Sequence, residues 1–449
     1  MTSNEIPTPK VPLKIALIGT GNRSQTIYHP LFGSLRPWME VVAVCDPVAE
    51  HCDTMAEQLG VRGYYDIHQL VKDKPMEAAL IVTPVPSHHS TSVYLSSHGI
   101  HNLCETSWCS MVSQAREMIE TARGSNVIVR VAENFLRFPI DRFSQVLRDS
   151  GYLGRIGRIF SYADHTGYHN NSRWVAFAQS HPLWVQSIEH TMGTAPFHSQ
   201  PQRYHDKETF RGRYFLFPSN LLVIDSAANV KGFLGRHPRP GYTEWQGERG
   251  TLVHRAHVTA FTGSTPVFSD DGKIIDRDPP SKRWDDYETE LHCCSAEKIH
   301  HEGDAPGWGG GIADEISPVR LEFDQQARWV SMYCRTGAGL LQYVNPHRPE
   351  RLDQHRNPGY YSAVMDHVID FALAVRGLRE SEFDEEDAMM SLMMEMGAKE
   401  SALNEGKRIR LPIEGELEAE ALVRQAQQKQ FGVDPMDVAG MLAISHSKP

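Results

Sequence analysis

Residues 14–24 read KIALIGTGNRS, an apolar run that ends directly in two closely spaced glycines and a polar stretch. Gly19 suits a tight turn, and Gly21 leaves bare backbone against which a pyrophosphate can lie. Ser24 stands where a third glycine is usual and is still small enough for close packing of helix on strand. The unpaired N–H groups at the start of the following helix, its positive dipole end, then face the phosphates. The stretch therefore predicts a strand, a turn and a helix that together bind a dinucleotide.

A carboxylate closes the next apolar run, VVAVCD (41–46), 27 residues after Gly19. Asp46 can accept hydrogen bonds from the hydroxyl groups of an adenosine ribose, and its charge repels a 2′-phosphate. The sequence therefore favours NAD over NADP as the cofactor. The structural alternative, in which Gly19, Gly21 and Asp46 form only a turn and a strand end, stays open.

The first 150 residues alternate short apolar runs with amphipathic stretches, which is typical of a parallel sheet with crossover helices. The apolar runs are continuous, as in strands that are buried on both faces. The expected strands are 14–19, 41–46, 78–84, 101–105 and 127–134. The expected helices include 48–60, 86–99 and 113–124. Residues 1–150 are therefore predicted to form an α/β domain, a doubly wound Rossmann sheet.

From about Leu153 the pattern changes to runs with alternating exposure, which indicates antiparallel strands. The expected strands here are 154–165, 213–217, 221–230 and 251–258. Residues 263–320 are dense in Gly, Pro and Asp and are expected to be loop-rich, whereas 361–376 and 384–404 are strongly helical. Residues 151–449 are therefore predicted to form an α+β domain with a mostly antiparallel sheet, whose final helices can pack back on the first domain.

The composition argues against several classes of function. Lys and Arg number 45 against 56 Asp and Glu, a net charge of −11, which argues against nucleic acid or a membrane surface as the partner. No apolar run approaches the roughly 18 residues of a membrane helix, and the polar start of the chain does not resemble a secretory signal. The seven cysteines include no CxxC pair, which favours reduced thiols and a cytoplasmic protein.

Four later stretches extend the glycine and aspartate pattern. They are TPVPSH (83–88), ETS (105–107), AENFLRFP (132–139) and the closing GKRIRLP (406–412). Together these stretches resemble the Gfo/Idh/MocA family, the relatives of glucose–fructose oxidoreductase and inositol dehydrogenase, over almost the whole chain. The residues expected to bind the cofactor are Gly19, Thr20, Gly21, Asn22, Arg23, Asp46, Thr83, Pro84, His88, Glu105 and Asn134.

The resemblance implies a Rossmann domain followed by an open, mostly antiparallel sheet with helices on one face. It also implies that NAD lies across the carboxyl ends of the parallel strands, with the nicotinamide facing the second sheet. The second domain would then bind the substrate, a carbohydrate or glycoside, and would form a homo-oligomer through its sheet.

The chain departs from the family pattern at a catalytic position. The family's Glu-Lys-Pro is Glu105-Thr106-Ser107 here, so a threonine stands where the lysine of ordinary family dehydrogenases helps to move the hydroxyl proton. A threonine hydroxyl donates a hydrogen bond but does not titrate near neutral pH. Glu105 can still orient the nicotinamide side of the cofactor.

The family's Asp-x-Gly-x-His stretch is aligned here with residues 186–190, which keep the histidine and replace the aspartate by Gln186. Imidazole is the side chain best matched to proton transfer near pH 7, so His190 is the leading candidate for the general base. The alternative is a structural histidine under a helix. Together with Tyr168 and Thr106, these two residues make up the expected catalytic set.

A polar segment precedes His190 and lies where substrates of the family bind. Its candidates for contacts to sugar hydroxyls, for a proton relay or for an apolar sugar face are Asp164, His165, Tyr168, His169, Arg173 and Trp174. The alternative is an exposed polar loop.

A second cluster invites comparison with metal sites. It consists of His292, Cys293, Cys294, His300 and His301. Adjacent cysteines rarely bind one ion together, and the spacing matches no common zinc module. No metal site is therefore expected.

Three functions remain open. The first is an NAD-dependent oxidoreductase that acts on a hydroxyl of a sugar or polyol. The second is a redox-neutral glycosidase or lyase, because EHTMGTAP (189–196) resembles a stretch of NAD-dependent glycosidases that also lack the lysine. In those enzymes the sugar is oxidised transiently, the glycosidic group is eliminated, water adds and the hydride returns. The third is a non-catalytic protein that keeps NAD as a structural ligand or sensor.

Overall fold

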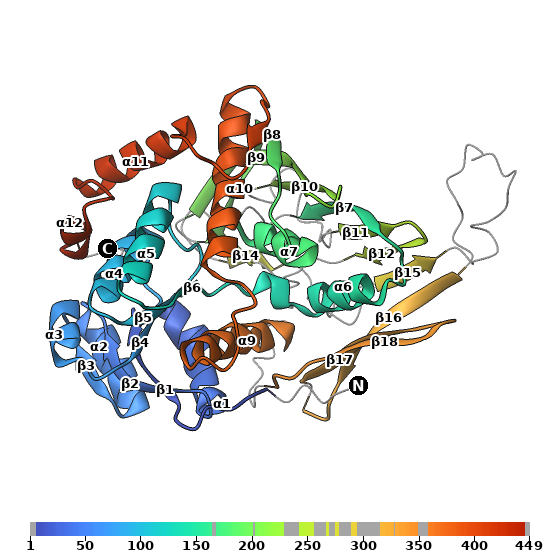
Figure 1. Cartoon of the computed structure of the whole chain (residues 1–449). Helices are drawn as coiled ribbons and strands as arrows, with labels where there is room; N and C mark the ends of the chain where they lie inside the picture. The colour runs from blue at the N-terminus through green and yellow to red at the C-terminus, as the bar shows by residue number, and fades with distance from the viewer. Residues whose placement is uncertain are drawn as a thin grey trace, which may run out of the picture.

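The computed structural model describes residues 6–163, 168–200, 203–228, 242–255, 266–268, 274–277, 289–293, 315–326, 328–348 and 358–444. Two sheets organise the chain, a parallel sheet in the N-terminal third and a larger, mostly antiparallel sheet after it (Figure 1). The predicted fold class, a Rossmann sheet followed by an α+β unit with an open antiparallel sheet, is confirmed.

The first sheet has six parallel strands in the order β3-β2-β1-β4-β5-β6. Their bounds are β1 (Leu13–Ile18), β2 (Met39–Cys45), β3 (Arg62–Tyr64), β4 (Ala78–Ile81), β5 (His101–Cys104) and β6 (Val129–Val131). The five expected strands are present, and β3 is additional because so short and polar a segment gives no strand signal of its own. The order reverses between β1 and β4, and ligands of such sheets bind at the carboxyl ends of strands at this reversal.

Four regular helices flank this sheet. They are α2 (Ala49–Leu59), α3 (Ile67–Asp73), α4 (His88–Ser97) and α5 (Val112–Gly124). The helix after the glycine turn is irregular and consists of a π-helical turn η1 (Ser24–Tyr28), a 3-10 turn η2 (His29–Leu31) and α1 (Phe32–Leu35). Pro30 lies in the middle turn and has no N–H to donate, which interrupts the regular hydrogen-bond pattern there.

The second sheet has the order β14-β13-β8-β9-β10-β7-β11-β12-β15-β16-β17-β18, with β19 beside β8. The bounds are β7 (Ile156–Ala163), β8 (Trp184–Gln200), β9 (Arg203–Leu216), β10 (Leu222–Ala228), β11 (Tyr242–Gly247), β12 (Gly250–His254), β13 (Pro266–Phe268), β14 (Ile274–Arg277), β15 (Thr289–Cys293), β16 (Glu315–Phe323), β17 (Trp329–Thr336), β18 (Gly339–Val344) and β19 (Ile409–Arg410). The segment 263–320, expected to be loop-rich, contributes β13, β14, β15 and the start of β16 in its described part. Only β7 and β10 pair in parallel among the described strands of this sheet.

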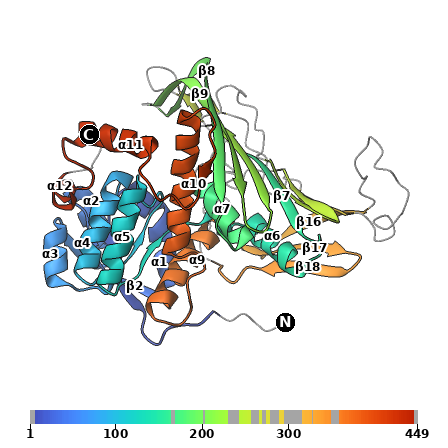
Figure 2. The ribbon, with the colours of Figure 1, turned by 45° about the horizontal axis from the view of Figure 1, so that its top comes forward.

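The remaining helices lie between and around the two sheets. They are α6 (Pro139–Ser150), α7 (Tyr168–Ala178), α9 (Pro358–Val375), α10 (Glu385–Leu403), α11 (Glu418–Phe431) and α12 (Val438–Leu442). Helix α10 contacts both α5 of the first unit and β8 of the second, and Figure 2 shows it between them. A Cβ at Gly397 of α10 would lie 2.7 Å from Cγ1 of Val185, so only glycine allows this close approach to the sheet.

The last segment of the chain returns to the Rossmann helices. Helix α12 packs against α4, and the Gln114 side chain donates to the carbonyl of Pro435 at 3.1 Å. No helix in the described residues carries an apolar stretch long enough to cross a bilayer.

Candidate cofactor and substrate site

A cavity of about 430 Å³ lies at the carboxyl ends of β4, β5 and β6. Helices α7 and α9 contribute to its wall, so the cavity is built from both parts of the chain. Its lining residues are Arg23, Val82, Thr83, Pro84, Val85, Glu105, Thr106, Asn134, Phe135, His169 and Tyr360. Six residues that the motifs assign to the cofactor or to catalysis therefore line this one cavity. They are Arg23, Thr83, Pro84, Glu105, Thr106 and Asn134.

The glycine turn after β1 has the geometry that its sequence predicts. Gly19 has φ of +87°, and a Cβ there would lie 2.7 Å from the carbonyl oxygen of Val82. Glycine is therefore required at this position both for its conformation and for space. A Cβ at Gly21 would meet nothing within 4 Å, so the space above the turn is open to a ligand. Asn22, at the start of the helix, is exposed beside it.

Asp46 is fixed at the end of β2, next to the turn. Its Oδ2 accepts hydrogen bonds from the backbone N–H of Thr20 at 2.7 Å and from the Thr20 hydroxyl at 3.1 Å. Its Oδ1 accepts from the N–H of Val48 at 2.9 Å. Thr20 therefore orients the carboxylate. The open turn, the helix start behind it and this carboxylate fit the diphosphate and adenosine ribose of NAD.

Glu105 is buried at the end of β5 and is surrounded by donors. Its Oε1 accepts from Arg23 Nε at 2.6 Å and from the Tyr28 hydroxyl at 2.9 Å. Its Oε2 accepts from the N–H and the hydroxyl of Thr106 at 2.6 and 2.9 Å. Burial raises the pKa of Glu105, but the Arg23 charge and these hydrogen bonds outweigh it and hold the pKa below its usual value. Both oxygens and the Thr106 hydroxyl are thus engaged within the chain.

His169 of α7 faces a carboxylate from the turn after β6. Its Nδ1 lies 3.2 Å from both carboxylate oxygens of Glu133, whose Oε1 also accepts from the N–H groups of Asn134 and Phe135. The Phe135 ring stacks on the imidazole, with 4.4 Å between ring centres. Burial lowers the pKa of His169, but Glu133 more than offsets this, and the pKa is raised above its usual value. The arrangement is that of an oriented general base or acid.

The structure does not bring His190 and Gln186 to this cavity. Residues 184–200 form strand β8, and successive side chains of a strand point to opposite faces. Val185 and Ser187 are buried on the face toward α10, whereas His190 is exposed on the opposite face. The Gln186 side chain donates to the carbonyl of Gly406 at 2.8 Å.

A signal for His169 was present in the sequence. Residues 165–169 read HTGYH, which keeps both the glycine and the histidine of the Asp-x-Gly-x-His pattern, whereas residues 186–190 keep only the histidine. Residues 165–169 therefore match the pattern better than residues 186–190 do. Asp164 and His165 lie outside the described residues.

The other candidates on α7 belong to the interior. Tyr168 is buried and does not line the cavity, and its hydroxyl has no hydrogen-bond partner among the described residues. Arg173 donates to Asp141 at 2.8 Å, and the Trp174 indole donates to Asp225 at 3.0 Å. Both side chains are buried, so they stabilise the packing of α7 and do not present a surface to a sugar.

His88 lies beneath the cavity, where it contacts two loops, and does not form part of the cavity wall. The side chain is buried, with Nε2 2.7 Å from the carbonyl oxygen of Thr83 and Nδ1 2.9 Å from that of Ser107. It thus connects the loop after β4 with the loop after β5, both of which line the cavity. In this geometry the imidazole positions Thr83, and the expected contact of His88 with the cofactor stays a prediction.

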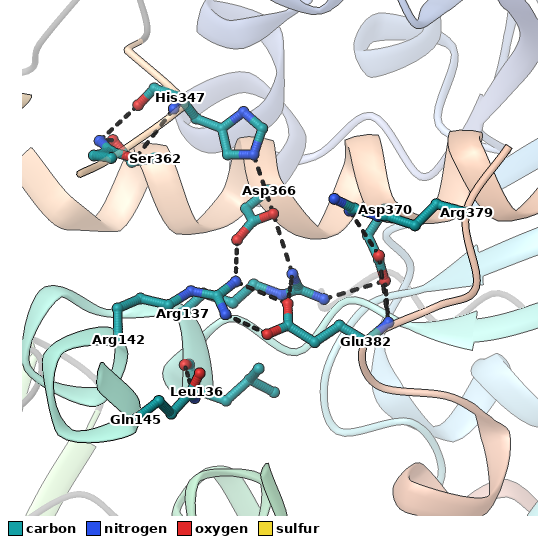
Figure 3. Close-up of polar contacts among 11 residues, drawn as sticks. Leu136, Arg137, Arg142, Gln145, His347, Ser362, Asp366, Asp370, Arg379 and Glu382 are labelled. Atoms are coloured by element: carbon teal, nitrogen blue, oxygen red, sulfur yellow. Dashed lines mark hydrogen bonds and ion pairs between the residues drawn. The ribbon is translucent and has the colours of Figure 1, made fainter. Parts of the chain in front are cut away.

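A cluster of ion pairs, buried except at Glu382, holds α9 in place beside the cavity (Figure 3). Arg137, from the turn after β6, pairs with Asp366 of α9 at 3.2 Å and with Glu382 at 2.8 Å. Arg142 of α6 pairs with the same two carboxylates. The cluster joins the Rossmann sheet to α9, the helix that carries Tyr360, and so fixes one wall of the cavity.

The possible metal cluster is only partly within the described residues. His292 of β15 pairs with Glu290 at 2.9 Å, and Cys293 is buried. Cys294, His300 and His301 lie outside the described residues. The described residues contain no group of three or more side chains placed to bind a metal ion.

Sequence comparisons find similarity in the N-terminal part of the chain. Residues 13–133 match the Gfo/Idh/MocA model, described as an oxidoreductase family with an NAD-binding Rossmann fold. D-glucoside 3-dehydrogenase of Escherichia coli (strain K12) is 30% identical over 151 residues, which are 33% of this chain and 42% of that protein. 2,7-anhydro-N-acetylneuraminate hydratase of Mediterraneibacter gnavus is 25% identical over 128 residues, 28% of this chain and 33% of that protein. The chain thus spans less than half the length of the curated relatives it matches.

Comparison of structures extends the similarity to both sheets. An oxidoreductase from Agrobacterium radiobacter, in complex with NAD⁺, L-tartaric acid and magnesium, has a TM-score of 0.59 at 14% sequence identity. The match covers 89% of this chain and 98% of that chain. At this identity the likeness shows a shared fold.

Proposed function

We propose that this chain is an NAD-dependent oxidoreductase that acts on a hydroxyl group of a sugar or polyol, because residues 13–133 match the Gfo/Idh/MocA oxidoreductase model. The observation that carries the proposal is the pair His169 and Glu133, which places an oriented imidazole at a cavity formed by the carboxyl ends of β4, β5 and β6. The substrate class rests on the similarity to D-glucoside 3-dehydrogenase.

The residues of the cavity supply the acid–base part of such a reaction. When bound, NAD⁺ would supply the hydride acceptor for the carbon that carries the hydroxyl group. His169 takes the hydroxyl proton, and the Glu133 carboxylate stabilises the imidazolium that results. The products would be a carbonyl compound, NADH and a proton held on His169. Thr106 does not titrate and donates its own hydroxyl to Glu105.

Asp46 supports NAD over NADP as the cofactor. The carboxylate is held at the end of β2 by Thr20 and Val48, where it accepts hydrogen bonds from a ribose diol and repels a 2′-phosphate.

A redox-neutral reaction is the second candidate. Thr106 replaces the lysine of ordinary family dehydrogenases, and one relative is named a hydratase. In such a reaction the hydride returns to the substrate, so NAD stays bound through many turnovers. A non-catalytic NAD-binding protein is the third candidate, and the oriented His169 weighs against it because a purely structural ligand needs no base at the cavity.

The first experiment is nucleotide analysis of the freshly purified protein, followed by a scan at 340 nm with free sugars, polyols and aryl glycosides. Weakly bound NAD with steady NADH formation from one substrate supports the oxidoreductase. Stoichiometric NAD with aglycone release and no accumulation of NADH supports the redox-neutral enzyme. Bound NAD with neither reaction supports the non-catalytic protein.

The outer face of the second sheet supports a homo-oligomer. Ile188 of β8 and Tyr214 of β9 are 58% and 40% exposed on neighbouring strands. Apolar side chains grouped on a sheet face are typical of interaction surfaces. Sedimentation of the wild type and of Ile188→Glu tests this: the variant sediments as a smaller species if the face is an interface, and an unchanged profile rejects it.

A further inference from the structure

The cavity contains one permanent positive charge among its described lining residues, and that charge comes from the glycine turn. Lysine is absent from the lining, and Arg23 is its only arginine. The resemblance described in the sequence analysis aligns Thr106 with a lysine that follows the glutamate in ordinary members of the family.

Arg23 is held in place by partners from two parts of the chain, the end of β5 and helix α9. Its Nε donates to Glu105 at 2.6 Å, its Nη2 lies 2.6 Å from the same oxygen, and its Nη1 donates to the Tyr360 hydroxyl of α9. The guanidinium also lies 5.7 Å from the centre of the Tyr360 ring. A guanidinium has five N–H donors, and these contacts use three of them. The side chain is 36% exposed, so donors remain for a ligand in the cavity.

The missing lysine combined two properties that these residues carry separately. A lysine supplies a positive charge and can also exchange a proton. An arginine remains charged at every physiological pH and therefore supplies only the charge. An oriented histidine titrates near neutral pH and supplies the proton exchange.

We propose that Arg23 and His169 divide the two roles of the lysine replaced by Thr106, with Arg23 as the fixed positive charge beside the reacting groups and His169 as the proton carrier. The inference rests on the proposed function, because it assumes that the nicotinamide occupies this cavity. Arg23 then stabilises negative charge that develops on the substrate oxygen, while Glu105 keeps the guanidinium turned toward the cavity.

The charges of Arg23 and Glu105 have a consequence that needs no substrate. The nicotinamide ring of NAD⁺ is positively charged and that of NADH is neutral. Arg23 therefore disfavours NAD⁺ relative to NADH, and Glu105 favours it. The ratio of the two dissociation constants, Kd(NAD⁺)/Kd(NADH), reports both charges, whereas contacts to the rest of the dinucleotide affect the two forms equally and cancel.

The experiment measures this ratio by fluorescence titration and calorimetry in Arg23→Met, Glu105→Gln and the double variant Arg23→Met/Thr106→Lys. We expect the ratio to fall about tenfold in Arg23→Met and to rise about tenfold in Glu105→Gln, the effect of one unit charge in a partly exposed site. Lysine at position 106 should bring the ratio of the double variant back to within about twofold of the wild type. Arg36→Met, which removes an exposed arginine from the end of the same irregular helix, is the matched control and should leave the ratio unchanged.

An unchanged ratio in Arg23→Met overturns the proposal. A double variant with the same ratio as Arg23→Met also overturns the proposal, because a positive charge at position 106 would then not replace the charge of Arg23. Failure of the proposed function is distinguishable, since wild-type protein that binds neither NAD⁺ nor NADH gives no ratio at all. Circular dichroism of each variant confirms that the fold is retained.

Discussion

The imidazole Nδ1 of His169 lies 3.2 Å from both carboxylate oxygens of Glu133. Glu133 follows the last strand of the Rossmann sheet, whereas His169 lies in α7, which follows the first strand of the second sheet. The Glu133 side chain has no exposed surface, and the N–H groups of the next two residues fix its Oε1. This contact joins the Rossmann sheet to α7 and at the same time sets the orientation and the basicity of the histidine. The two functions of the pair can be separated by substitution.

Glu133→Gln keeps the size of the side chain and removes its charge. Because Glu133 holds the pKa of His169 above its usual value, the pKa falls in the variant. Oxidation needs the neutral imidazole, so the acid limb of the kcat/KM profile moves to lower pH. The rate on the plateau falls about 100-fold, since the imidazolium loses its partner. Kinetics from acid to alkaline pH check both effects, and an acid limb that stays in place contradicts the assignment.

The same pair predicts how stability depends on pH. The pKa of His169 is raised in the folded protein, so its contribution to the free energy of unfolding is fully present below the ordinary histidine pKa of about 6.5. The contribution is lost as the pH rises through the raised value. Urea unfolding of the wild type and of His169→Asn should therefore differ more at acid than at alkaline pH, and a difference that grows with pH contradicts the pairing.

A matched pair of histidine variants separates the cavity from the outer sheet face. His169→Asn should lower turnover about 1,000-fold and leave NAD affinity within about threefold, because it removes only the proton carrier. His190→Asn changes an exposed side chain of β8 and should leave both quantities near wild type. Loss of turnover in the second variant, with turnover kept in the first, would return the role of general base to His190.

The cofactor half of the site could be predicted from sequence because its determinants are local. Gly19 and Asp46 each end a continuous apolar strand, and the carboxyl ends of adjacent parallel strands lie together in every such sheet. His88 shows the limit of this reasoning. Its motif marks the loop after β4 correctly, but only the structure shows that the imidazole lies beneath the wall and binds two carbonyl groups.

The catalytic half depends on contacts between distant segments. Arg23 meets Tyr360, 337 positions along the chain, and no pattern in either segment signals the other. His190 lies in strand β8, where side chains alternate between the face toward α10 and the opposite, exposed face. A histidine one position earlier or later would have faced α10. The sequence places His169 among six polar candidates and Glu133 in the AENFLRFP stretch, but the two lie 36 residues apart and neither stretch shows that they meet.

Asp46→Ala tests the cofactor preference. The substitution removes the acceptor held by Thr20 and Val48, so the dissociation constant for NAD should rise about tenfold. The constant for NADP should rise less or fall, because the repulsion of the 2′-phosphate is also removed. Titration of both nucleotides against Asp46→Ala and Asp53→Ala, a control on the exposed face of α2, checks this. Equal losses for both nucleotides would remove Asp46 from the ribose site.

Two glycine variants in one turn should fail in different ways. In Gly19→Ala the new methyl group would lie 2.7 Å from the carbonyl oxygen of Val82, and the backbone φ of +87° is strained for alanine. We expect this variant to lose about 3 kcal/mol of unfolding free energy, because neither the strand end nor the carbonyl can move away cheaply.

In Gly21→Ala the methyl group meets no atom of the protein within 4 Å, so the melting temperature should stay near that of the wild type. The methyl group does enter the space above the turn that is open to the diphosphate. The dissociation constant for NAD should therefore rise about 100-fold while the fold is retained. Thermal melting of both variants measures the predicted loss of stability, and nucleotide titration measures the predicted loss of NAD affinity. If Gly21→Ala binds NAD as tightly as the wild type, the diphosphate does not lie over this turn, and the cofactor must enter the cavity from another side.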